Sequence, residues 1–409
     1  METVGTENDL KPKKKRWLWL VVGLAVVILI VGGFVFLRNG AGKKTEEKAE
    51  NGTEPDSSST KILTATIPQE ILNNKFGFLG GGEEDNTFVG DVGAAWVRPH
   101  PGPFLWDAMQ SGTGAEIDFS QTDKVAKANQ GLEYGTLATL WPFANWDQEI
   151  SANAAECQVS TNDEFLPKSK ESTKKGRTDY LPKYRCKPTD WDKYTYWVGR
   201  VVERYDGDGA DDMTGLKLPI KFWEMMNEPD LTSPEAEPRL DFWKGNEADY
   251  AELLIKTYAA IKAADSTANI LVAGAAGGEK QFLDFYRQVF ADKETHAAFD
   301  IANIHCISND RQTHDFNVGA YKNMLAEFGL LQPIWVTEAE AFYGSGSADT
   351  NYQTTKISTS AALAAGAERI FFTRYSFDDF RTDMSQKSKS SGYDSATKYR
   401  ELIKSFSNK

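Results

Sequence analysis

The chain is poor in the residues that build metal centres and redox sites. Its 409 residues include three cysteines and four histidines, and no two histidines stand in a His-x-x-x-His spacing. A barrel esterase or deacetylase needs a Ser/His arrangement or a set of metal ligands, so the sequence gives little support to those enzymes. We accordingly expect no cofactor and no metal ion.

A net basic charge is missing as well. The 46 lysines and arginines are outnumbered by 59 aspartates and glutamates, which gives a formal net charge of −13. Phosphate binding needs a net basic face, and the basic residues are not clustered in the folded part of the sequence. Nucleic acid is therefore not an expected partner.

A long apolar run lies near the amino end of the chain. The basic segment Lys11–Arg16 (KPKKKR) precedes Trp17–Leu37, which contains no charged residue. At about 1.5 Å per residue in a helix, this run can cross a hydrocarbon core of roughly 30 Å. Basic residues on its amino side favour a cytoplasmic amino end, although Arg38, Lys43 and Lys44 weaken the asymmetry.

The sequence therefore predicts four parts: a cytoplasmic basic segment 1–16, a transmembrane helix 17–37, a flexible linker 38–61 and a folded part 62–409. This organisation predicts a single-pass protein of the cell membrane with its folded part on the extracytoplasmic side. A cleaved signal peptide is the alternative. The apolar run exceeds the usual length of a signal core, however, and no small-x-small cleavage site follows it cleanly.

Two of the cysteines, Cys157 and Cys186, lie in one polar stretch. Outside the cytoplasm they can form a disulfide, and closing a loop of about 30 residues stabilises a fold by roughly 3 to 4 kcal/mol in the chain-entropy model. Two unpaired thiols are the alternative. Cys306 lies within an apolar strand, where a buried small hydrophobic residue is expected.

From residue 62 onward, apolar strands alternate with helical patterns, as in parallel βα units. This alternation predicts an α/β fold, a (β/α)8 TIM barrel, with a long loop insertion at about 147–190 on the third connection. The expected strands are Phe76–Gly80, Ala94–Arg98, Tyr134–Leu140, Ile220–Met226, Ile270–Ala273, Ile301–His305, Ile334–Glu338 and Ile370–Arg374. The clearest expected helices are Ala248–Ala264, Lys280–Phe290, Val318–Phe328 and Thr354–Ala365.

Two of these strands run directly into a carboxylate. Lys221–Asp230 reads KFWEMMNEPD and Pro333–Gly344 reads PIWVTEAEAFYG, which places Glu228 and Glu338 at the carboxyl ends of the fourth and seventh strands. Side chains at those ends face a common mouth in a TIM barrel. One glutamate can donate a proton while the other acts as a nucleophile, which is the division of labour of a glycosidase.

The run W-E-x-x-N-E-P at Trp223–Pro229, followed by W-V-T-E at Trp335–Glu338, resembles the glycoside hydrolases of clan A. This likeness covers about residues 62–409 and implies a retaining glycosidase of the barrel superfamily. It implies that Glu228 is the general acid/base, that Glu338 is the nucleophile, and that Asn227 binds the 2-hydroxyl of the sugar. For N-E-P alone, a turn with a helix cap after a strand is an equally good interpretation.

The resemblance also assigns roles to Arg98, near the nucleophile, and to His305, beside the acid/base. Alternatively, Arg98 pairs with a buried carboxylate such as Glu224, and His305 is a core residue. Glu340 is a rival for the nucleophile because it lies two residues beyond Glu338, on the same face of the strand.

The chain departs from the clan pattern at two places. Ile307 stands where many members carry a tyrosine, and the tryptophan that often floors the sugar site is missing after the eighth strand, where Tyr375 is a possible substitute. We expect Trp141, Phe143 and Trp146 to stack on sugar rings at the mouth, with rim packing as the alternative.

The sequence thus predicts a membrane-anchored, extracellular retaining glycoside hydrolase that cleaves a poly- or oligosaccharide. The alternative is a carbohydrate-binding barrel with weak or no turnover, which the two departures favour. A last feature is the acidic loop Asp206–Asp212 (DGDGADD), which has oxygen ligands at calcium-like spacing but lacks the complete calcium signature. We interpret it as a polar turn.

Overall fold

The computed structural model describes residues 64–167, 180–233, 240–307, 314–340, 347–377 and 394–407. The chain divides into two units, Met1–Thr60 and Lys61–Lys409. The predicted basic segment 1–16, transmembrane helix 17–37 and linker 38–61 lie outside the described residues. Within the described part, no helix is both long and apolar enough to span a bilayer.

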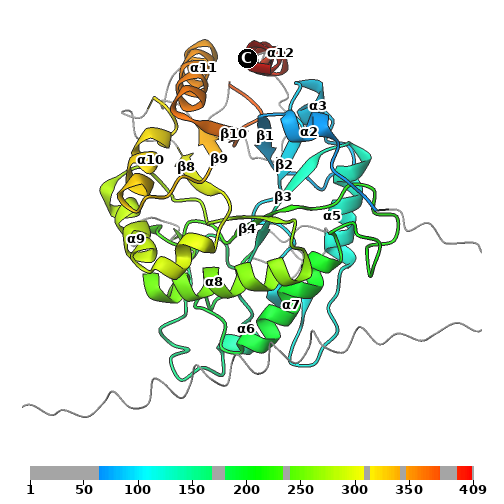
Figure 1. The fold of residues 1–409 in the computed structure, drawn as a ribbon, viewed down its shortest axis with the longest axis vertical. Coiled ribbons are helices and arrows are strands. Elements are labelled where there is room, and N and C mark those ends of the chain that lie inside the picture. The colour runs from blue at the N-terminus through cyan, green and yellow to red at the C-terminus, as the bar shows by residue number, and fades with distance from the viewer. Residues whose placement is uncertain are drawn as a thin grey trace, which may run out of the picture. The chain divides into compact units, whose positions relative to one another are not determined.

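Eight parallel strands form the centre of the second unit, surrounded by helices (Figure 1). They follow the order β7-β4-β3-β2-β1-β10-β9-β8. Bridges from Leu271 to Ile301 and from Ala275 to Ile304 join the two end strands and close the barrel. All eight predicted strands are confirmed, as β1 (Phe76–Leu79), β2 (Trp96–Arg98), β3 (Gly135–Leu140), β4 (Phe222–Met225), β7 (Asn269–Leu271), β8 (Ala302–Ile307), β9 (Ile334–Glu340) and β10 (Ala367–Phe372).

Helices connect these strands in the βα order that the sequence predicts. The four clearest expected helices are confirmed as α8, α9, α10 and α11. Among the described residues the helices are α2 (Gln69–Asn73), α3 (Phe88–Asp91), α4 (Trp106–Met109), α5 (Ser120–Gly131), α6 (Asn145–Gln148), α7 (Trp191–Glu203), α8 (Glu247–Ala264), α9 (Lys280–Ala291), α10 (Val318–Glu327), α11 (Ala348–Ala365) and α12 (Ser395–Ser407), with a short 3-10 helix η1 (Lys293–Ala297).

Local signals explain where the longer helices begin and end. Asn246 and Asp249 form a reciprocal capping box at the start of α8. The Asp190 side chain accepts a hydrogen bond from the backbone N–H of Lys193 at the start of α7. Gly366, with a φ of 116°, ends α11 in the left-handed conformation that glycine adopts without steric cost.

The barrel interior is layered because alternate residues of a strand face the same side. The lower layer is apolar and buried; it includes Leu79, Trp96, Leu137, Phe222, Leu271, Ile301, Trp335 and Phe371. Two residues further along their strands come Arg98, Thr139, Glu224 and Asn303, all at most 1% exposed. The interior therefore changes from apolar to polar towards the carboxyl ends of the strands.

The insertion after β3 is held by specific contacts rather than by regular structure. Cys157 and Cys186 form the predicted disulfide, with Cα atoms 5.2 Å apart. Arg185 and Asp163 form a fully buried ion pair at 2.7 Å. Beyond α6, the described parts of the insertion, 149–167 and 180–190, contain no helix, as predicted.

A two-stranded antiparallel hairpin follows β4 and was not predicted. It pairs β5 (Thr232–Ser233) with β6 (Leu240–Asp241). The Arg185 guanidinium of the insertion donates a hydrogen bond to the backbone oxygen of Asp241. The hairpin and the insertion therefore support each other.

Candidate active site

Strand β4 ends in an unusual backbone conformation that presents Glu228. Met226 and Glu228 have φ angles of 69° and 41°. These left-handed values are uncommon for residues other than glycine and are found most often at functional sites. Between the two, Asn227 forms a bridge with Gly274 beyond β7, which fixes the turn.

Strand β9 contains a register irregularity just before Glu338. On the neighbouring strand β8, Ile304 pairs with Val336 but His305 pairs with Glu338, so that Thr337 is an extra residue. A bulge of this kind re-aims the side chains next to it. Here both Thr337 and Glu338 contact polar groups of the barrel interior.

Glu228 and Glu338 converge, as the sequence predicts. One side-chain oxygen of each and one nitrogen of His305 all lie within 4.8 Å of one another. Glu228 and Glu338 are 5% and 4% exposed, and His305 is fully buried. Residues 110 positions apart in the chain thus form one buried cluster.

Arg98 lies beneath this cluster and donates to three acceptors. Its Nη1 bonds Glu338 Oε1 at 2.7 Å, its Nη2 bonds Asn227 Oδ1 at 2.7 Å, and its Nε bonds Glu224 Oε2 at 2.8 Å. The two expectations for Arg98 therefore hold together: it pairs with the buried Glu224 and also contacts Glu338. The guanidinium orients Glu338 and Asn227 at once.

The electrostatic surroundings of the two glutamates differ. Burial raises the pKa of Glu228 to about 7, with a further contribution from Glu224, while the Arg98 charge acts in the opposite direction. Burial also raises the pKa of Glu338, which is opposed by His305 and by the directly bonded Arg98. Glu228 is therefore suited to carry a proton near neutral pH, while Glu338 has a cation in contact to stabilise its ionised form.

His305 connects Glu228 to a chain of buried hydrogen bonds. Its Nδ1 lies 2.7 Å from Glu228 Oε1, and its Nε2 lies 2.8 Å from Thr337 Oγ1. Burial lowers the pKa of His305 to about 4, so the imidazole is neutral and has a single N–H. His305 therefore lies beside Glu228 as expected, and the remaining question is which nitrogen carries the hydrogen.

The partners of Thr337 answer that question. Asn303 Nδ2 donates to Glu224 Oε1 at 2.6 Å, which leaves Asn303 Oδ1 to accept from the Thr337 hydroxyl at 2.8 Å. The Thr337 oxygen then accepts from Nε2–H of His305, and Nδ1 becomes an acceptor. Glu228 completes the chain by donating its own proton to Nδ1. The network thus favours the protonated form of Glu228, the form that a general acid needs.

Glu340, the rival for the nucleophile, is bonded elsewhere. Its carboxylate accepts from the Arg374 Nη2 at 2.8 Å and from the Thr373 hydroxyl at 3.0 Å, both at the end of β10. Glu338, in contrast, belongs to the cluster with Glu228. The geometry therefore favours Glu338.

His100, which sequence reasoning missed, borders the cluster. Its Nδ1 lies 4.0 Å from Glu338 Oε1 and, within the described part of the chain, has no hydrogen-bond partner. Burial lowers the pKa of His100 well below its usual range. The ring is surrounded by Trp141, Phe165 and Phe242. Its position two residues after Arg98, just past the end of β2, was the available signal.

The aromatic residues expected to stack on sugar rings are engaged within the protein. Trp141 is fully buried and its Nε1 donates to Pro101 O at 2.6 Å. Trp146 donates to Gln110 O at 2.7 Å and packs edge-on against Trp106. The structure thus corrects the expectation for Trp141 and for Phe143, which are both fully buried and stabilise the rim. Trp146 is half-buried, and its stacking on a sugar ring stays a prediction.

Tyr375 also requires correction. It is 4% exposed, its hydroxyl donates to Leu79 O at 2.8 Å, and its ring packs against Phe78 and Phe88. The Tyr375 ring therefore packs in the aromatic core at the ends of β1 and β10 and does not form the floor of the sugar site.

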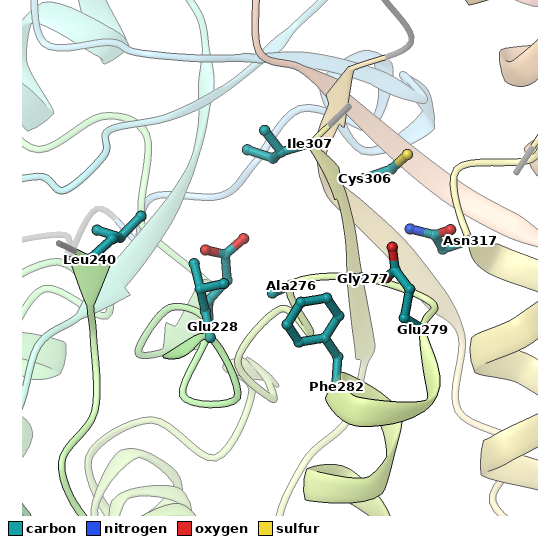
Figure 2. A pocket seen from close by; sticks show the side chains of 10 residues that line it. Glu228, Leu240, Ala276, Gly277, Glu279, Phe282, Cys306, Ile307 and Asn317 are labelled. Carbon is teal, nitrogen blue, oxygen red and sulfur yellow. The ribbon is translucent and has the colours of Figure 1, made fainter. Parts of the chain in front are cut away.

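A cavity of about 490 Å³ opens beside Glu228 (Figure 2). Its walls come from the segment after β4, from β6, from the segment after β7, from the end of β8, from the first turn of α9 and from the residue that precedes α10. The lining residues are Glu228, Leu231, Leu240, Ala276, Gly277, Glu279, Phe282, Cys306, Ile307 and Asn317. Ile307, the residue that departs from the clan pattern, is thus part of this wall.

Among the residues that the structure describes, two groups of acidic or imidazole side chains are compact enough to hold a metal ion. The first is the cluster of Glu228, His305 and Glu338, where the Arg98 guanidinium already supplies a positive charge. The second comprises Asp206, Asp208 and Asp212. In that loop, Asp212 accepts from the backbone N–H groups of Gly207 and Gly209, which is the pattern of a polar turn.

Comparison with known proteins places this geometry in context. Residues 203–405 match the family model described as glycosyl hydrolase catalytic core. The fold is similar to that of a glucosidase from Croceicoccus marinus, with a TM-score of 0.54, 13% identity, and coverage of 81% of this chain and 67% of that one. It is also similar to a beta-galactosidase from Bacillus circulans sp. alkalophilus, with a TM-score of 0.52, 11% identity, and coverage of 85% and 56%.

At these identities the two likenesses show a shared fold. The chain spans 67% and 56% of the lengths of the two proteins. No curated protein matches the chain in sequence.

Proposed function

We propose that this chain cleaves O-glycosidic bonds of a poly- or oligosaccharide with retention of configuration, from the premise that residues 203–405 match the family model of a glycosyl hydrolase catalytic core and that the strands form a TIM barrel. The observation that carries this proposal is the approach of Glu228 and Glu338, whose oxygens lie within 4.8 Å of each other. Retaining glycosidases hold their two carboxyl groups about 5 to 5.5 Å apart, whereas inverting enzymes leave room for a water molecule.

In the first step, Glu338 attacks the anomeric carbon while Glu228 donates its proton to the departing glycosidic oxygen. The product is a glycosyl ester on Glu338. In the second step, Glu228 removes a proton from water, the water oxygen bonds the anomeric carbon, and the ester bond to Glu338 breaks. The contact from Arg98 to Asn227 holds the amide beside Glu228, where it can meet the 2-hydroxyl of the sugar.

Trapping with a mechanism-based fluorosugar tests this proposal. A panel of 2-deoxy-2-fluoro glycosyl fluorides is incubated with the protein, and the labelled peptide is mapped by mass spectrometry. We expect a label on Glu338. Absence of a label across a broad sugar panel, together with retained sugar binding, would instead favour the second candidate function.

That second candidate is a carbohydrate-binding barrel with weak or no turnover. Two observations favour it: Ile307 replaces the tyrosine of the clan pattern, and Tyr375 is buried in the core. Against it, Asn227, Glu228 and Glu338 are all present and share one buried network.

We further propose that the protein is anchored in the cell membrane by Trp17–Leu37, with the barrel on the extracytoplasmic side. The apolar run supports the anchor. The disulfide between Cys157 and Cys186 supports an oxidising compartment. Protease treatment of intact cells is expected to degrade the barrel, whereas protection of the barrel until the cells are lysed would contradict this placement.

A further inference from the structure

We propose that the cavity beside Glu228 binds the sugar unit that leaves with the glycosidic oxygen, and that it selects a unit without negative charge. This inference rests on the proposed function, because it takes Glu228 as the proton donor. Among the described residues, the lining of the cavity includes Glu228 but not Glu338. The cavity therefore lies on the side of the general acid, which is the side from which the leaving group must depart.

The apolar part of the lining suits a sugar ring. Phe282 is half-buried on the first turn of α9, Leu240 lies across the cavity, and Ile307 is 49% exposed at its edge (Figure 2). Aromatic and aliphatic side chains of this kind pack against the C–H face of a pyranose. The site thus offers a surface for the apolar face of a sugar.

The polar part of the lining consists of hydrogen-bond acceptors and an amide. Glu279 is exposed, and within the described residues no hydrogen bond or ion pair engages its carboxylate. Asn317 already uses its Nδ2 on the backbone oxygen of His305, at 2.9 Å. A ligand must therefore supply hydrogen-bond donors, as sugar hydroxyls do. A purely apolar group would leave the Glu279 carboxylate without a partner as it lost contact with water.

The charge of the lining sets the selectivity. The Glu279 carboxylate borders the cavity beside Glu228, and no lysine or arginine is among the described lining residues. Burial raises the pKa of the neighbouring Asp230 well above its usual range, and Glu228 and Glu279 raise that pKa further. A uronic acid or a sulfated sugar would bring a second negative charge close to Glu279, and none of the described lining residues supplies a cation to pair with it. An uncharged sugar meets no such barrier.

Gly277 makes the close arrangement of Glu279 and Phe282 possible. A Cβ at this position would lie 2.2 Å from Glu279 Oε2 and 2.9 Å from a ring carbon of Phe282. The carboxylate and the ring thus lie directly over the glycine. Gly277→Ala is therefore a small change that must displace both groups.

The test separates the leaving-group site from the catalytic pair by measuring acceptor transfer. A 2-deoxy-2-fluoroglycosyl group is first trapped on Glu338, and excess reagent is removed. An added sugar then reacts in the reverse of the first step, in the place of the leaving group. Its hydroxyl gives its proton to Glu228, its oxygen bonds the anomeric carbon, and the ester bond to Glu338 breaks. The rate of enzyme reactivation reports how well the cavity binds that sugar.

Matched acceptors probe the charge selectivity at low ionic strength: methyl glucoside against methyl glucuronide, and methyl galactoside against methyl galacturonide. For the wild type we expect a neutral sugar to accelerate reactivation at least 10-fold more than its uronate. Glu279→Lys should reduce that ratio at least 10-fold by improving the uronates. Glu294→Lys makes the same charge change at an exposed position in η1, outside the cavity lining, and should keep the wild-type ratio.

Two further variants probe the apolar face. Phe282→Ala and Gly277→Ala should each lower the acceleration of reactivation by sugars. The factor of this loss should be at least 10 times the factor by which the variant changes reactivation by water alone. Tyr196→Ala, which removes a 61% exposed ring on α7, serves as the matched control. Melting curves of all variants should show that each is folded at the assay temperature, so that unfolding is not the cause.

The inference is overturned if neutral sugars and uronates accelerate the wild type equally, or if Glu279→Lys leaves their ratio unchanged. It is also overturned if benzyl alcohol accelerates reactivation and no sugar does, which would indicate an apolar leaving group. Failure to label Glu338 at all would contradict the proposed function itself, and the inference would fall with it. A label on Glu338 without any acceleration by sugars would contradict only the inference.

Discussion

A single guanidinium, that of Arg98, organises the centre of this site. It is fully buried, and its three acceptors come from β4, from the turn after β4 and from β9. Burial works against its charge, but Glu224 and Glu338 raise the pKa of Arg98 above its ordinary value. The residue therefore acts on structure and on chemistry together.

Replacement of Arg98 should separate these two effects. Arg98→Met leaves two buried carboxylates without a cation, so we expect a loss of about 3 to 5 kcal/mol in the free energy of unfolding and at least a 100-fold loss of kcat/KM. Arg98→Lys keeps the charge but not the three-way geometry, and should lie between Met and wild type. Denaturant titration and steady-state kinetics measure the two quantities. Full activity in Arg98→Met would contradict the role assigned to this residue.

The raised pKa of Glu228 predicts the pH dependence of activity and of stability. Because the acid must be protonated, kcat/KM should fall as pH rises through about 7. The folded state also holds this proton more tightly than the unfolded state, whose pKa is near 4.5. Its contribution to stability is therefore complete below about 4.5 and is lost as pH rises through about 7.

Glu228→Gln isolates this contribution, because glutamine does not titrate. The variant should show a smaller loss of stability than the wild type between pH 5 and pH 8, measured by denaturant titration at each pH. Its residual activity on a substrate with an activated leaving group should lack the fall near pH 7. Parallel stability curves for the two proteins would show that Glu228 is not the titrating group.

His100 provides a test of sugar contact near the nucleophile. His100→Phe preserves a ring of similar shape between Trp141, Phe165 and Phe242 and removes a buried nitrogen that has no partner in the described structure. We expect an unchanged or raised melting temperature and at least a 10-fold lower kcat/KM, because a sugar hydroxyl loses its partner. Unchanged kinetics would show that the His100 ring only packs.

At the scale of elements, strand periodicity explains both what the sequence predicts and what it misses. All eight strands follow from their apolar runs, and the two glutamates follow from strand ends that share one face of a barrel. The extra residue Thr337 in β9 is not visible in the pattern, because a register shift depends on the neighbouring strand. Without that bulge, Thr337 and Glu338 would point to opposite sides of the strand.

The aromatic residues illustrate a second limit. Trp141, Trp146 and Tyr375 occur close to strand ends, where either sugar stacking or rim packing is compatible with the sequence. Their burial is decided by distant partners, such as Phe242 for Trp141 and Phe88 for Tyr375. Tertiary contacts of this kind cannot be derived from local composition.

The disulfide predicts how the insertion contributes to stability. Removing it with Cys157→Ser and Cys186→Ser together should lower the free energy of unfolding by about 3 kcal/mol, because the unfolded chain regains the freedom of a loop of about 30 residues. Denaturant titration measures the change. Wild type treated with reductant should match the double variant, and a double variant as stable as untreated wild type would contradict the prediction.

At the scale of the whole molecule, the sequence and the structure together separate the chemistry from the predicted anchor. Lys61–Lys409 forms one unit that contains every residue of the proposed site. The barrel is filled from its apolar layer to its polar layer by its own strands. Catalysis and folding should therefore depend on this unit alone, while the location of the protein should depend on residues 1–60.

A chain that begins at Lys61 tests this separation. We expect it to melt within about 2 °C of the full-length protein in detergent and to hydrolyse a soluble substrate with the same kcat/KM, since no residue of the site is removed. After expression it should move from the membrane fraction to the soluble fraction, because the predicted span of Trp17–Leu37 is gone. Full-length protein with two aspartates introduced near the middle of that run is the matched control, and it should leave the membrane as well. A shortened chain that stays in the membrane fraction would contradict the predicted anchor, and one that loses activity while folded would show that the first 60 residues take part in catalysis.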